Sequence, residues 1–203
     1  MISVKKKAPL ESFKDFVCNE KPKEWGEIHS QKKYPNLYDC IKVALAEEQG
    51  GISAYTEEPL SKDSRGNHID HFRKRSLFSN LAFDWNNLFV DGVSENYGAK
   101  FKDKQIKKEG YALLISPSEE NVERFFSYME NGEIVVAKGL SPQDAKRAAF
   151  TIEMFNLTDS GLTSRRASVI KIINDYSDLS SEDIRTNLQS FGFKSVVEYA
   201  LTK

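Results

Sequence analysis

Two of the three histidines of this 203-residue chain lie in one short stretch, GNHIDHFRKRS, which spans residues 66–76. There Asp70 stands beside His71, and three basic residues follow. A carboxylate next to a neutral imidazole suits metal-assisted phosphodiester cleavage: the carboxylate holds a hard divalent ion, and the imidazole takes a proton from the attacking water. In a regular strand Asp70 and His71 would point to opposite faces, so this chemistry predicts a turn or bulge beside His71.

The charge of the chain is unevenly spread. Residues 61–108 carry ten Lys or Arg against six Asp or Glu, so this middle part is +4 while the whole chain is -1. A locally basic region on a near-neutral protein favours a polyanionic partner. With 39% hydrophobic residues, the chain can bury a substantial core.

Other features of the sequence indicate in which cellular compartment the protein is expected. No apolar run approaches the roughly 20 residues that span a bilayer, and the amino terminus lacks the apolar core of a signal peptide. We therefore expect a cytoplasmic protein with no membrane partner. The two cysteines, Cys18 and Cys40, are expected to be reduced structural thiols, with Cys40 on the apolar side of a helix.

The elements that must position these residues fall into three segments. Residues 1–50 show a helical pattern of apolar residues that stops at Gly50 and Gly51. Residues 51–110 are turn-rich and contain Asp70, His71 and the basic residues that follow them. Residues 111–203 predict a strand pair, formed by 111–117 and 132–138, followed by a carboxy-terminal helical segment that begins at Ser141 and Pro142.

Asp70 and His71, then Asn87 in WNNLFV and Asn96 in ENYGAK, resemble the HNH (ββα-metal) nuclease motif. That motif has an Asp-His pair on a first strand, an Asn just before a second strand, and a last Asn on the following helix. The resemblance implies an α+β fold, with a ββα-metal nuclease core embedded between helical amino- and carboxy-terminal segments.

Further motifs over residues 35–170 are similar to one HNH family in particular. It is the family of the Septu anti-phage nuclease subunit PtuB and of similar nucleases in some retron operons. The motifs that carry this resemblance are IK..L...Q.G, AY.E, IDHF...S, FDWNNL, LISPSEEN, NGEI and AAFTIEMFNLTDSGLTSRR.

The resemblance assigns roles to the four motif residues. It implies that Asp70 and Asn96 hold one Mg²⁺ or Mn²⁺ ion, that His71 is the general base, and that Asn87 braces the loop and orients the imidazole. His68 is open between a packing role, which we favour, and a role near the metal. Four basic residues are expected to contact the phosphate backbone of a nucleic acid: Arg73, Lys74, Arg75 and Lys100.

The sequence departs from the family at a zinc-binding frame. Many relatives have two Cys-x-x-Cys pairs, whereas the corresponding positions here are Ser53, Thr56, Gly92 and Glu95. A structural zinc is therefore expected to be absent. Apolar packing should replace its stabilising contribution, from these residues: Tyr55, Phe72, Phe83, Trp85, Leu88 and Phe89.

The function expected from the resemblance is a metal-dependent HNH endonuclease, with DNA favoured over RNA. It would be the effector of an anti-phage system controlled by a PtuA-type ATPase, with a retron reverse transcriptase and its msDNA as further partners in a retron. One alternative is a catalytically inactive HNH-like adaptor that binds nucleic acid or the ATPase. Another is a stand-alone homing or restriction-type enzyme.

Overall fold

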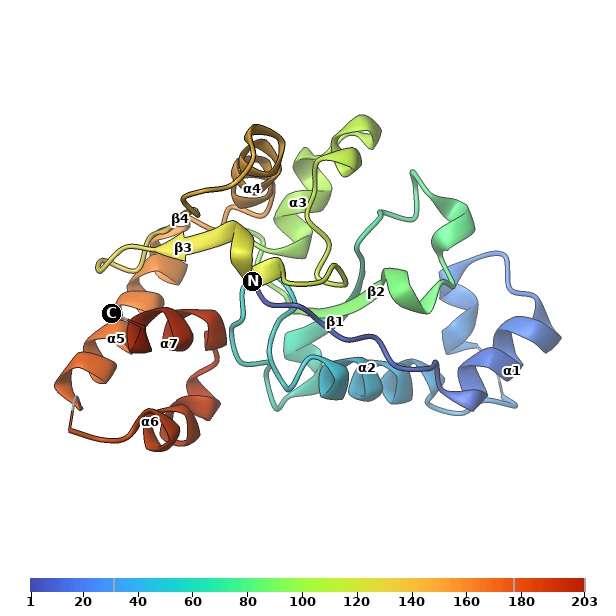
Figure 1. Cartoon of the computed structure of the whole chain (residues 1–203). Helices are drawn as coiled ribbons and strands as arrows, with labels where there is room; N and C mark the ends of the chain where they lie inside the picture. The colour runs from blue at the N-terminus through green and yellow to red at the C-terminus, as the bar shows by residue number, and fades with distance from the viewer. Residues whose placement is uncertain (31, 177, 203) are drawn as a thin grey trace.

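The computed structural model describes residues 1–30, 32–176 and 178–202. Within them it contains seven α-helices and two small antiparallel sheets, which is a mixed α+β fold (Figure 1). The helices are α1 (Glu11–Glu20), α2 (Leu37–Glu48), α3 (Ala99–Gln105), α4 (Pro142–Met154), α5 (Ser160–Asp175), α6 (Ser181–Leu188) and α7 (Lys194–Leu201). The strands are β1 (Asn67–His71), β2 (Leu88–Gly92), β3 (Phe126–Tyr128) and β4 (Ile134–Val136). None of the helices in this described part is long and apolar enough to cross a membrane.

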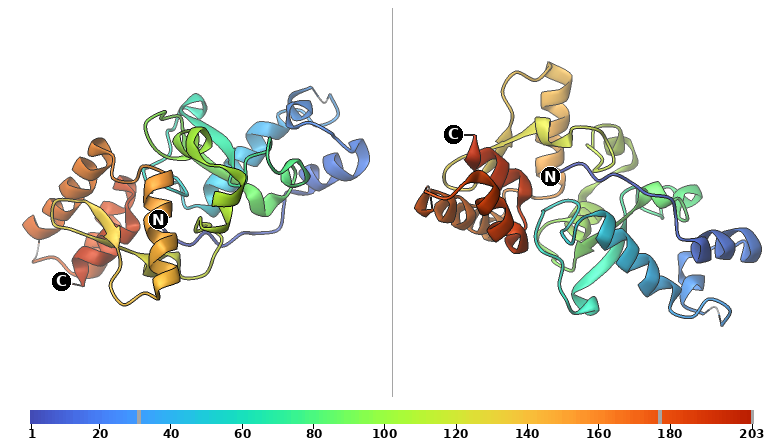
Figure 2. Two further views of the ribbon diagram at one scale, coloured as in Figure 1. Left: turned by 90° about the horizontal axis from the view of Figure 1, so that it is seen from above. Right: turned by 60° about the horizontal axis from the view of Figure 1, so that its bottom comes forward.

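The strands β1 and β2 form the centre of the molecule. They pair antiparallel, with Asp70 opposite Phe89 and His71 opposite Leu88. In Figure 1, α2 runs below this sheet and α3 lies above it. Seen from two further sides, the amino-terminal and carboxy-terminal helices lie at opposite ends, with the sheet between them (Figure 2). The order along the chain at the centre is thus strand, strand, helix.

One face of the central sheet packs on the amino-terminal helices. Leu37, Ile41 and Leu45 are spaced four residues apart along α2, so they form one stripe, and all three are buried against Leu88 and Val90. Phe13 and Phe16 of α1 and Trp25 of the 3₁₀-helix η1 (Trp25–His29) complete this cluster. Gly50 and Gly51 end the segment after α2 with φ of +67° and +78°, a conformation that glycine adopts at little cost.

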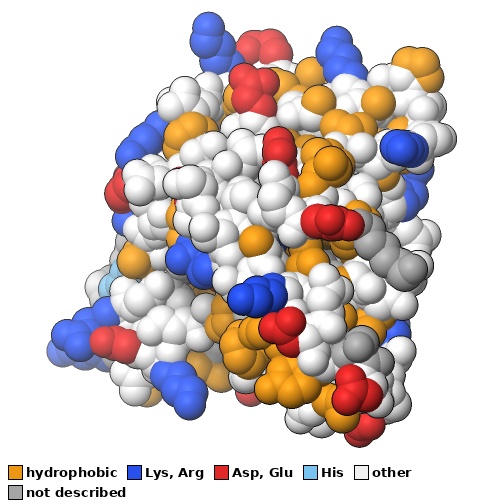
Figure 3. Space-filling model, turned by 90° about the vertical axis from the view of Figure 1, so that its left-hand side faces the viewer, with side chains coloured by type: hydrophobic (Ala, Val, Ile, Leu, Met, Phe, Trp, Pro, Cys, Tyr) orange, Lys and Arg blue, Asp and Glu red, His pale blue; other side chains and the backbone are white. Residues whose placement is uncertain are grey.

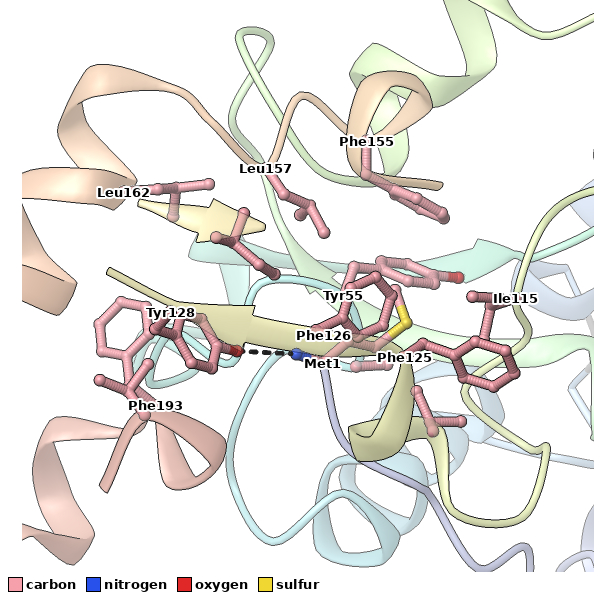
Figure 4. Packing of buried hydrophobic residues seen from close by; sticks show 14 of the residues in the cluster. Met1, Tyr55, Ile115, Phe125, Phe126, Tyr128, Phe155, Leu157, Leu162 and Phe193 are labelled. Atoms are coloured by element: carbon pink, nitrogen blue, oxygen red, sulfur yellow. Dashed lines mark hydrogen bonds between the residues drawn. The ribbon is translucent and has the colours of Figure 1, made fainter. Parts of the chain in front are cut away.

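The opposite face contributes to a second, larger core with the carboxy-terminal part. Tyr55 stacks on Phe155 with ring centroids 4.5 Å apart, and both side chains are fully buried (Figure 4). Met1 packs into the same cluster, where its amino group meets Tyr128 and the buried carboxylate of Glu57. The carboxy-terminal helices therefore share one core with the central sheet.

The helix start predicted at Ser141 and Pro142 agrees with the structure. Ser141 caps α4 by accepting a hydrogen bond from the backbone N–H of Asp144, with Pro142 at the first helical position. Ser180 caps α6 in the same way through the N–H of Asp183. The amino-terminal helical segment also contains the helices that its apolar stripes predict.

The predicted strand pair is wrong in one partner. Strand β4 lies within residues 132–138, but it pairs with β3 and not with residues 111–117. A tight turn at Asn131 and Gly132, where Gly132 has φ of +82°, joins β3 to β4 and makes this local pairing the easier one. Residues 111–117 instead pack on α4, where Ile115 N–H donates to Thr151 Oγ1 at 3.0 Å.

The cysteines are both free, but Cys40 does not lie on the apolar side of its helix as predicted. Cys18 and Cys40 are exposed. The buried stripe of α2 follows Leu37, Ile41 and Leu45, and Cys40 lies beside that stripe on the solvent side.

Gly98 fixes the entry to α3, and its replacement by alanine should destabilise the protein. Its φ is +76° and its ψ is -152°, and a Cβ there would collide with Oδ2 of Asp91. We expect Gly98→Ala to lower the free energy of unfolding by about 2–3 kcal/mol in urea denaturation. Gly139→Ala is the matched control, because Gly139 also has a positive φ, +81°, whereas a Cβ there would point into open space. Equal losses in the two variants would contradict the role of the Asp91 contact.

Candidate active site

A cleft of about 700 Å³ runs along β1. Its lining includes four consecutive strand residues, 68–71, together with parts of α3 and of the segment that begins η1. Consecutive residues can line one cleft because β1 pairs with β2 on one side only, so its other edge is free. Residues that alternate between the two faces of the strand therefore line the same cleft.

This free edge brings Asp70 and His71 together without a bulge. Their side chains leave opposite faces of β1, Asp70 on the side of Phe89 and His71 on the side of Leu88. Both nevertheless line the cleft, and both are 5% exposed. The predicted bulge beside His71 is absent from the described structure, since the β1–β2 pairing continues through His71. Strand β1 ends there, however, and the backbone bends directly after it, at Phe72 and Arg73.

The His71 ring is fixed by two contacts. Its Nε2 lies 2.9 Å from the carbonyl oxygen of Ala82, and its ring meets Trp25 edge-on with centroids 4.7 Å apart. A carbonyl only accepts hydrogen bonds, so Nε2 carries the proton and Nδ1 keeps its lone pair. Burial lowers the pKa of His71 from 6.5 to about 4, although the Ala82 carbonyl and Asp70 oppose the shift. The imidazole is thus neutral near pH 7 and able to accept a proton at Nδ1.

This pKa shift predicts a pH dependence of stability. Between pH 6.5 and about 4 the unfolded chain binds a proton at His71 that the folded protein does not bind. The free energy of unfolding should therefore fall as the pH falls through this window, by about 3 kcal/mol from this group. We expect His71→Gln to remove that share, so that urea denaturation from pH 7 to 4 gives a shallower decline than in the wild type. Parallel declines would contradict the shift.

Asp70 belongs to a buried cluster behind the cleft. Its Oδ2 accepts hydrogen bonds from the Tyr55 hydroxyl at 2.5 Å and from Lys102 Nζ at 3.0 Å. Lys102 is completely buried, and its ammonium also donates to the carbonyls of His71 and Phe72, at 3.2 and 3.0 Å. Lys102 thus ties α3 to the end of β1.

The charges in this cluster stabilise one another. Burial would raise the pKa of Asp70, but the Lys102 ammonium and the hydrogen bonds from Tyr55 and Lys102 outweigh it and hold that pKa below its usual value. Burial would lower the pKa of Lys102, and the carboxylates of Asp70 and Asp103 raise it instead. Both partners of the Asp70–Lys102 pair are therefore ionised at neutral pH.

Asp103 is the second carboxylate that lines the cleft close to this cluster. Its Oδ1 is buried, makes no hydrogen bond and lies 3.2 Å from Lys102 Nζ. Burial raises the pKa of Asp103, and the negative charge of Asp70 adds to that effect, while Lys102 opposes it. Two carboxylates on one cleft suit Mg²⁺, which often takes one or two protein carboxylates and keeps several waters. The described residues contain no cluster of three or more His, Cys, Asp or Glu side chains that could hold a metal.

Asn87 braces the loop between β1 and β2. Its Oδ1 accepts from the backbone N–H of Arg73 at 2.7 Å, and its Nδ2 donates to the carbonyls of Arg73 and Leu81, both at 3.1 Å. The next carbonyl after Leu81 is that of Ala82, which binds the imidazole of His71. Asn87 is thus buried outside the cleft and holds the loop that carries the Ala82 carbonyl.

Asn96 does not lie on the helix, which corrects the prediction from the motif. Helix α3 begins at Ala99, and Asn96 is an exposed residue of the preceding loop that does not line the cleft. The backbone at Gly98 is not helical, and its N–H donates to the carbonyl of Phe155 at 2.9 Å. The Asn96 carbonyl accepts from Asn156 Nδ2 at 2.7 Å, so the carboxy-terminal part holds this loop.

The structure places three of the four predicted basic residues on the cleft, namely Lys74, Arg75 and Lys100. Arg73 lies outside it, with its guanidinium 5.3 Å from the centre of the Phe78 ring. Lys23 and Lys104 also line the cleft, although they were not among the four predicted phosphate contacts. The cleft thus has basic residues on both sides of β1.

Other polar residues near the site connect elements. His68 lines the cleft, and its Nδ1 is buried without a hydrogen bond. Asp91 accepts from Ser53 Oγ at 2.6 Å and from the N–H of Ala99 at 2.7 Å, so it links the turn at Ser53 to the start of α3. Ser53 is one of the four positions at which the resemblance implied a zinc-binding cysteine. It is joined to α3 by hydrogen bonds through Asp91.

Arg165 and Arg166 support the structure around the site. Arg165 Nη2 lies 2.8 Å from both Glu58 Oε1 and the Tyr97 hydroxyl, and so bridges two loops next to α3. Arg166 is 2% exposed and donates to the carbonyl of Leu157 at 2.8 Å. Neither residue lines the cleft.

Two residues of the site, Trp25 and Asp103, were not predicted from the sequence, and neither was the burial of Lys102. A signal existed for Asp103, because it follows Lys100 by three residues and shares its side of a helix. Lys102 is one of several lysines in AKFKDKQIKK, and nothing local marks it as buried. Trp25 comes from a distant segment.

In comparison with known proteins, no protein-family model matches this chain, and no curated protein matches it by sequence.

Proposed function

We propose that this protein is a metal-dependent endonuclease of the HNH type, with β1, β2 and α3 as its ββα core. The observation that carries the proposal is the cleft along β1, whose lining includes the neutral imidazole of His71, the carboxylates of Asp70 and Asp103, and several basic residues. Basic residues favour the phosphate backbone of a nucleic acid, and the imidazole and carboxylates supply the groups that hydrolysis needs. We propose DNA as the substrate.

The proposed chemistry at His71 follows from its ring geometry. Nδ1 would accept the proton of a water molecule, and the resulting hydroxide would attack the phosphorus in line with the departing 3′-oxygen. The Ala82 carbonyl would stabilise the imidazolium that forms when Nδ1 is protonated, since its hydrogen bond from Nε2–H strengthens with positive charge. Trp25 holds the ring edge-on and limits its rotation.

Asp70 and Asp103 are the residues that we propose for holding a divalent cation such as Mg²⁺ or Mn²⁺. When bound, such an ion would offset negative charge on the phosphate and on the leaving oxygen. The place of Asp70 and Asp103 on the same cleft supports this assignment. Asn96, the ligand implied by the resemblance, would have to turn toward the cleft from its exposed loop.

The test is cleavage of supercoiled plasmid DNA by the purified chain, alone and with its ATPase partner, in Mg²⁺ or in EDTA. Relaxed and linear products that form only with Mg²⁺ are expected. Asp103→Asn should lower the cleavage rate and raise the Mg²⁺ concentration at half-maximal rate, while Asp159→Asn, at the cap of α5, should leave that concentration unchanged. Products in EDTA at the wild-type rate would contradict metal dependence.

We also propose a PtuA-type ATPase as the partner, with a retron reverse transcriptase and its msDNA in a retron setting. The carboxy-terminal helices carry exposed apolar side chains, Tyr176, Leu179 and Phe191, around a groove of about 420 Å³. Figure 3 faces this end of the molecule and shows hydrophobic side chains gathered in its lower part. Co-purification of the full chain with an ATPase encoded beside it tests the partner.

One observation favours the alternative of an adaptor without catalysis. The Oδ2 of Asp70 already accepts bonds from Tyr55 and Lys102, which leaves this carboxylate less free for a cation. An adaptor would bind nucleic acid or the ATPase equally well in Mg²⁺ and in EDTA, and would release no cleaved product.

A further inference from the structure

Glu95 links two lysines of the cleft wall. Lys100 Nζ lies 2.8 Å from Glu95 Oε1, and Lys104 Nζ lies 2.6 Å from Glu95 Oε2. All three side chains line the cleft that holds Asp70 and His71. The two lysines are four residues apart on α3, so their ammonium groups lie on one side of the helix.

The Glu95 carboxylate meets the two lysines in the way that a phosphodiester group of a nucleic acid could. A phosphodiester, like a carboxylate, carries one negative charge on two oxygens of a single centre, and each oxygen can accept from one ammonium. Glu95 presents its two oxygens to the two lysines in this way. The hydrogen bonds from both lysines lower the pKa of Glu95 to about 2, so the carboxylate is ionised at any pH at which the protein would work.

The ion pairs of Glu95 with Lys100 and Lys104 are also easy to replace by another anion. The Glu95 and Lys104 side chains are each 55% exposed, and Glu95 lies in the loop before α3. Exposed ion pairs contribute little to stability, so little opposes their replacement by another anion. Lys74 also lines the cleft, but its Nζ donates to the backbone carbonyl of Asp103 at 2.7 Å and not to Glu95.

We propose that Lys100 and Lys104 form a phosphate-binding subsite for the nucleic-acid backbone, and that Glu95 occupies it as an internal competitor until the substrate displaces it. This inference rests on the proposed function, because it assigns one backbone phosphate of the proposed substrate to a place on the cleft. Glu95 thereby weakens binding of nucleic acid that lacks contacts elsewhere in the cleft.

The test measures binding of a short fluorescein-labelled DNA duplex to the full chain in EDTA by fluorescence anisotropy. Glu95→Gln should tighten binding at least about threefold, since the lysines then meet the phosphate without competition. Glu11→Gln is the matched control. It removes the same charge from an exposed Glu–Lys pair on α1, away from the cleft, and should change the affinity little.

The Lys100→Gln/Lys104→Gln background separates the proposed competition from a general effect of charge. In that background binding should be weaker, and Glu95→Gln should have no more effect than Glu11→Gln. An equal gain from Glu95→Gln with and without the lysines would overturn the inference, as would equal affinities of Glu95→Gln and Glu11→Gln in the parent. Circular dichroism melting checks that the exposed substitutions leave the fold intact.

The outcome is separate from that of the nuclease proposal. Binding in EDTA does not depend on catalysis, so Glu95 competition can be found in a protein that does not cut. Conversely, Mg²⁺-dependent cleavage with no Glu95 effect on affinity would leave the nuclease proposal in place and remove only the subsite.

Discussion

Replacing His71 by alanine is expected to reduce the cleavage rate by about 10²–10⁴-fold, the usual contribution of a positioned general base. The reason is that His71 lines the cleft and its Nε2–H donates to the Ala82 carbonyl, which fixes the ring and leaves the lone pair of Nδ1 to accept a proton. Plasmid cleavage in Mg²⁺, with and without the proposed ATPase partner, measures the effect. Affinity for the DNA duplex in EDTA should stay within about twofold, because the neutral imidazole carries no charge to the phosphate.

His29→Ala is the matched control for this prediction. His29 is exposed on η1 and its ring contacts that of Tyr38 at an interplanar angle of 41°, away from the cleft lining, so its loss should leave cleavage unchanged. If His71→Ala cut DNA as fast as the wild type and bound it equally, the endonuclease proposal would fail. A loss of cleavage together with a lost thermal transition would call for His71→Gln, which keeps more of the side-chain volume.

Lys102→Met should destabilise the protein strongly. The substitution leaves the Asp70 carboxylate buried without its cation, and it removes the donor to the carbonyls of His71 and Phe72. Removing one partner of a buried ion pair typically costs about 3–5 kcal/mol of unfolding free energy. Urea denaturation monitored by tryptophan fluorescence measures the loss.

Two further variants test whether the unpaired charge of Asp70 causes the loss of stability in Lys102→Met. Lys102→Met/Asp70→Asn removes that charge and should recover part of the lost stability. Lys104→Met alters a lysine two residues later that is 55% exposed, and should change stability little. If Lys102→Met were as stable as Lys104→Met, the buried ion pair would not hold α3 to β1 as described.

Local signals were sufficient for most of the helices. The stripe Leu37, Ile41 and Leu45 predicted a helix because its spacing matches the helical repeat, and serine at position 141 followed by proline marked a helix start. The same kind of reasoning failed for the second sheet. Apolar character in residues 111–117 suggested a strand, but the turn at Gly132 joined β4 to a nearer partner.

The chemical groups of the candidate site were predictable in part. Asp70 and His71 are adjacent in the sequence, and together with Asn87, Asn96 and the flanking motifs they led to the prediction of a nuclease site. Their convergence was not predictable, because a regular strand directs neighbouring side chains to opposite faces. The free edge of a two-stranded sheet brings both to one cleft, and strand number is a property of the folded chain.

The sequence by itself determined the adjacent acid and imidazole, the basic middle of the chain and most of the helices, because residue type, charge and periodicity are local properties. Only the tertiary structure decided that Lys102 is buried against Asp70, that Trp25 packs on His71, and that Asp103 rather than Asn96 lines the cleft. Those contacts join segments that are distant along the chain. They depend on how the helices pack on the two faces of β1 and β2, which no short stretch of sequence specifies.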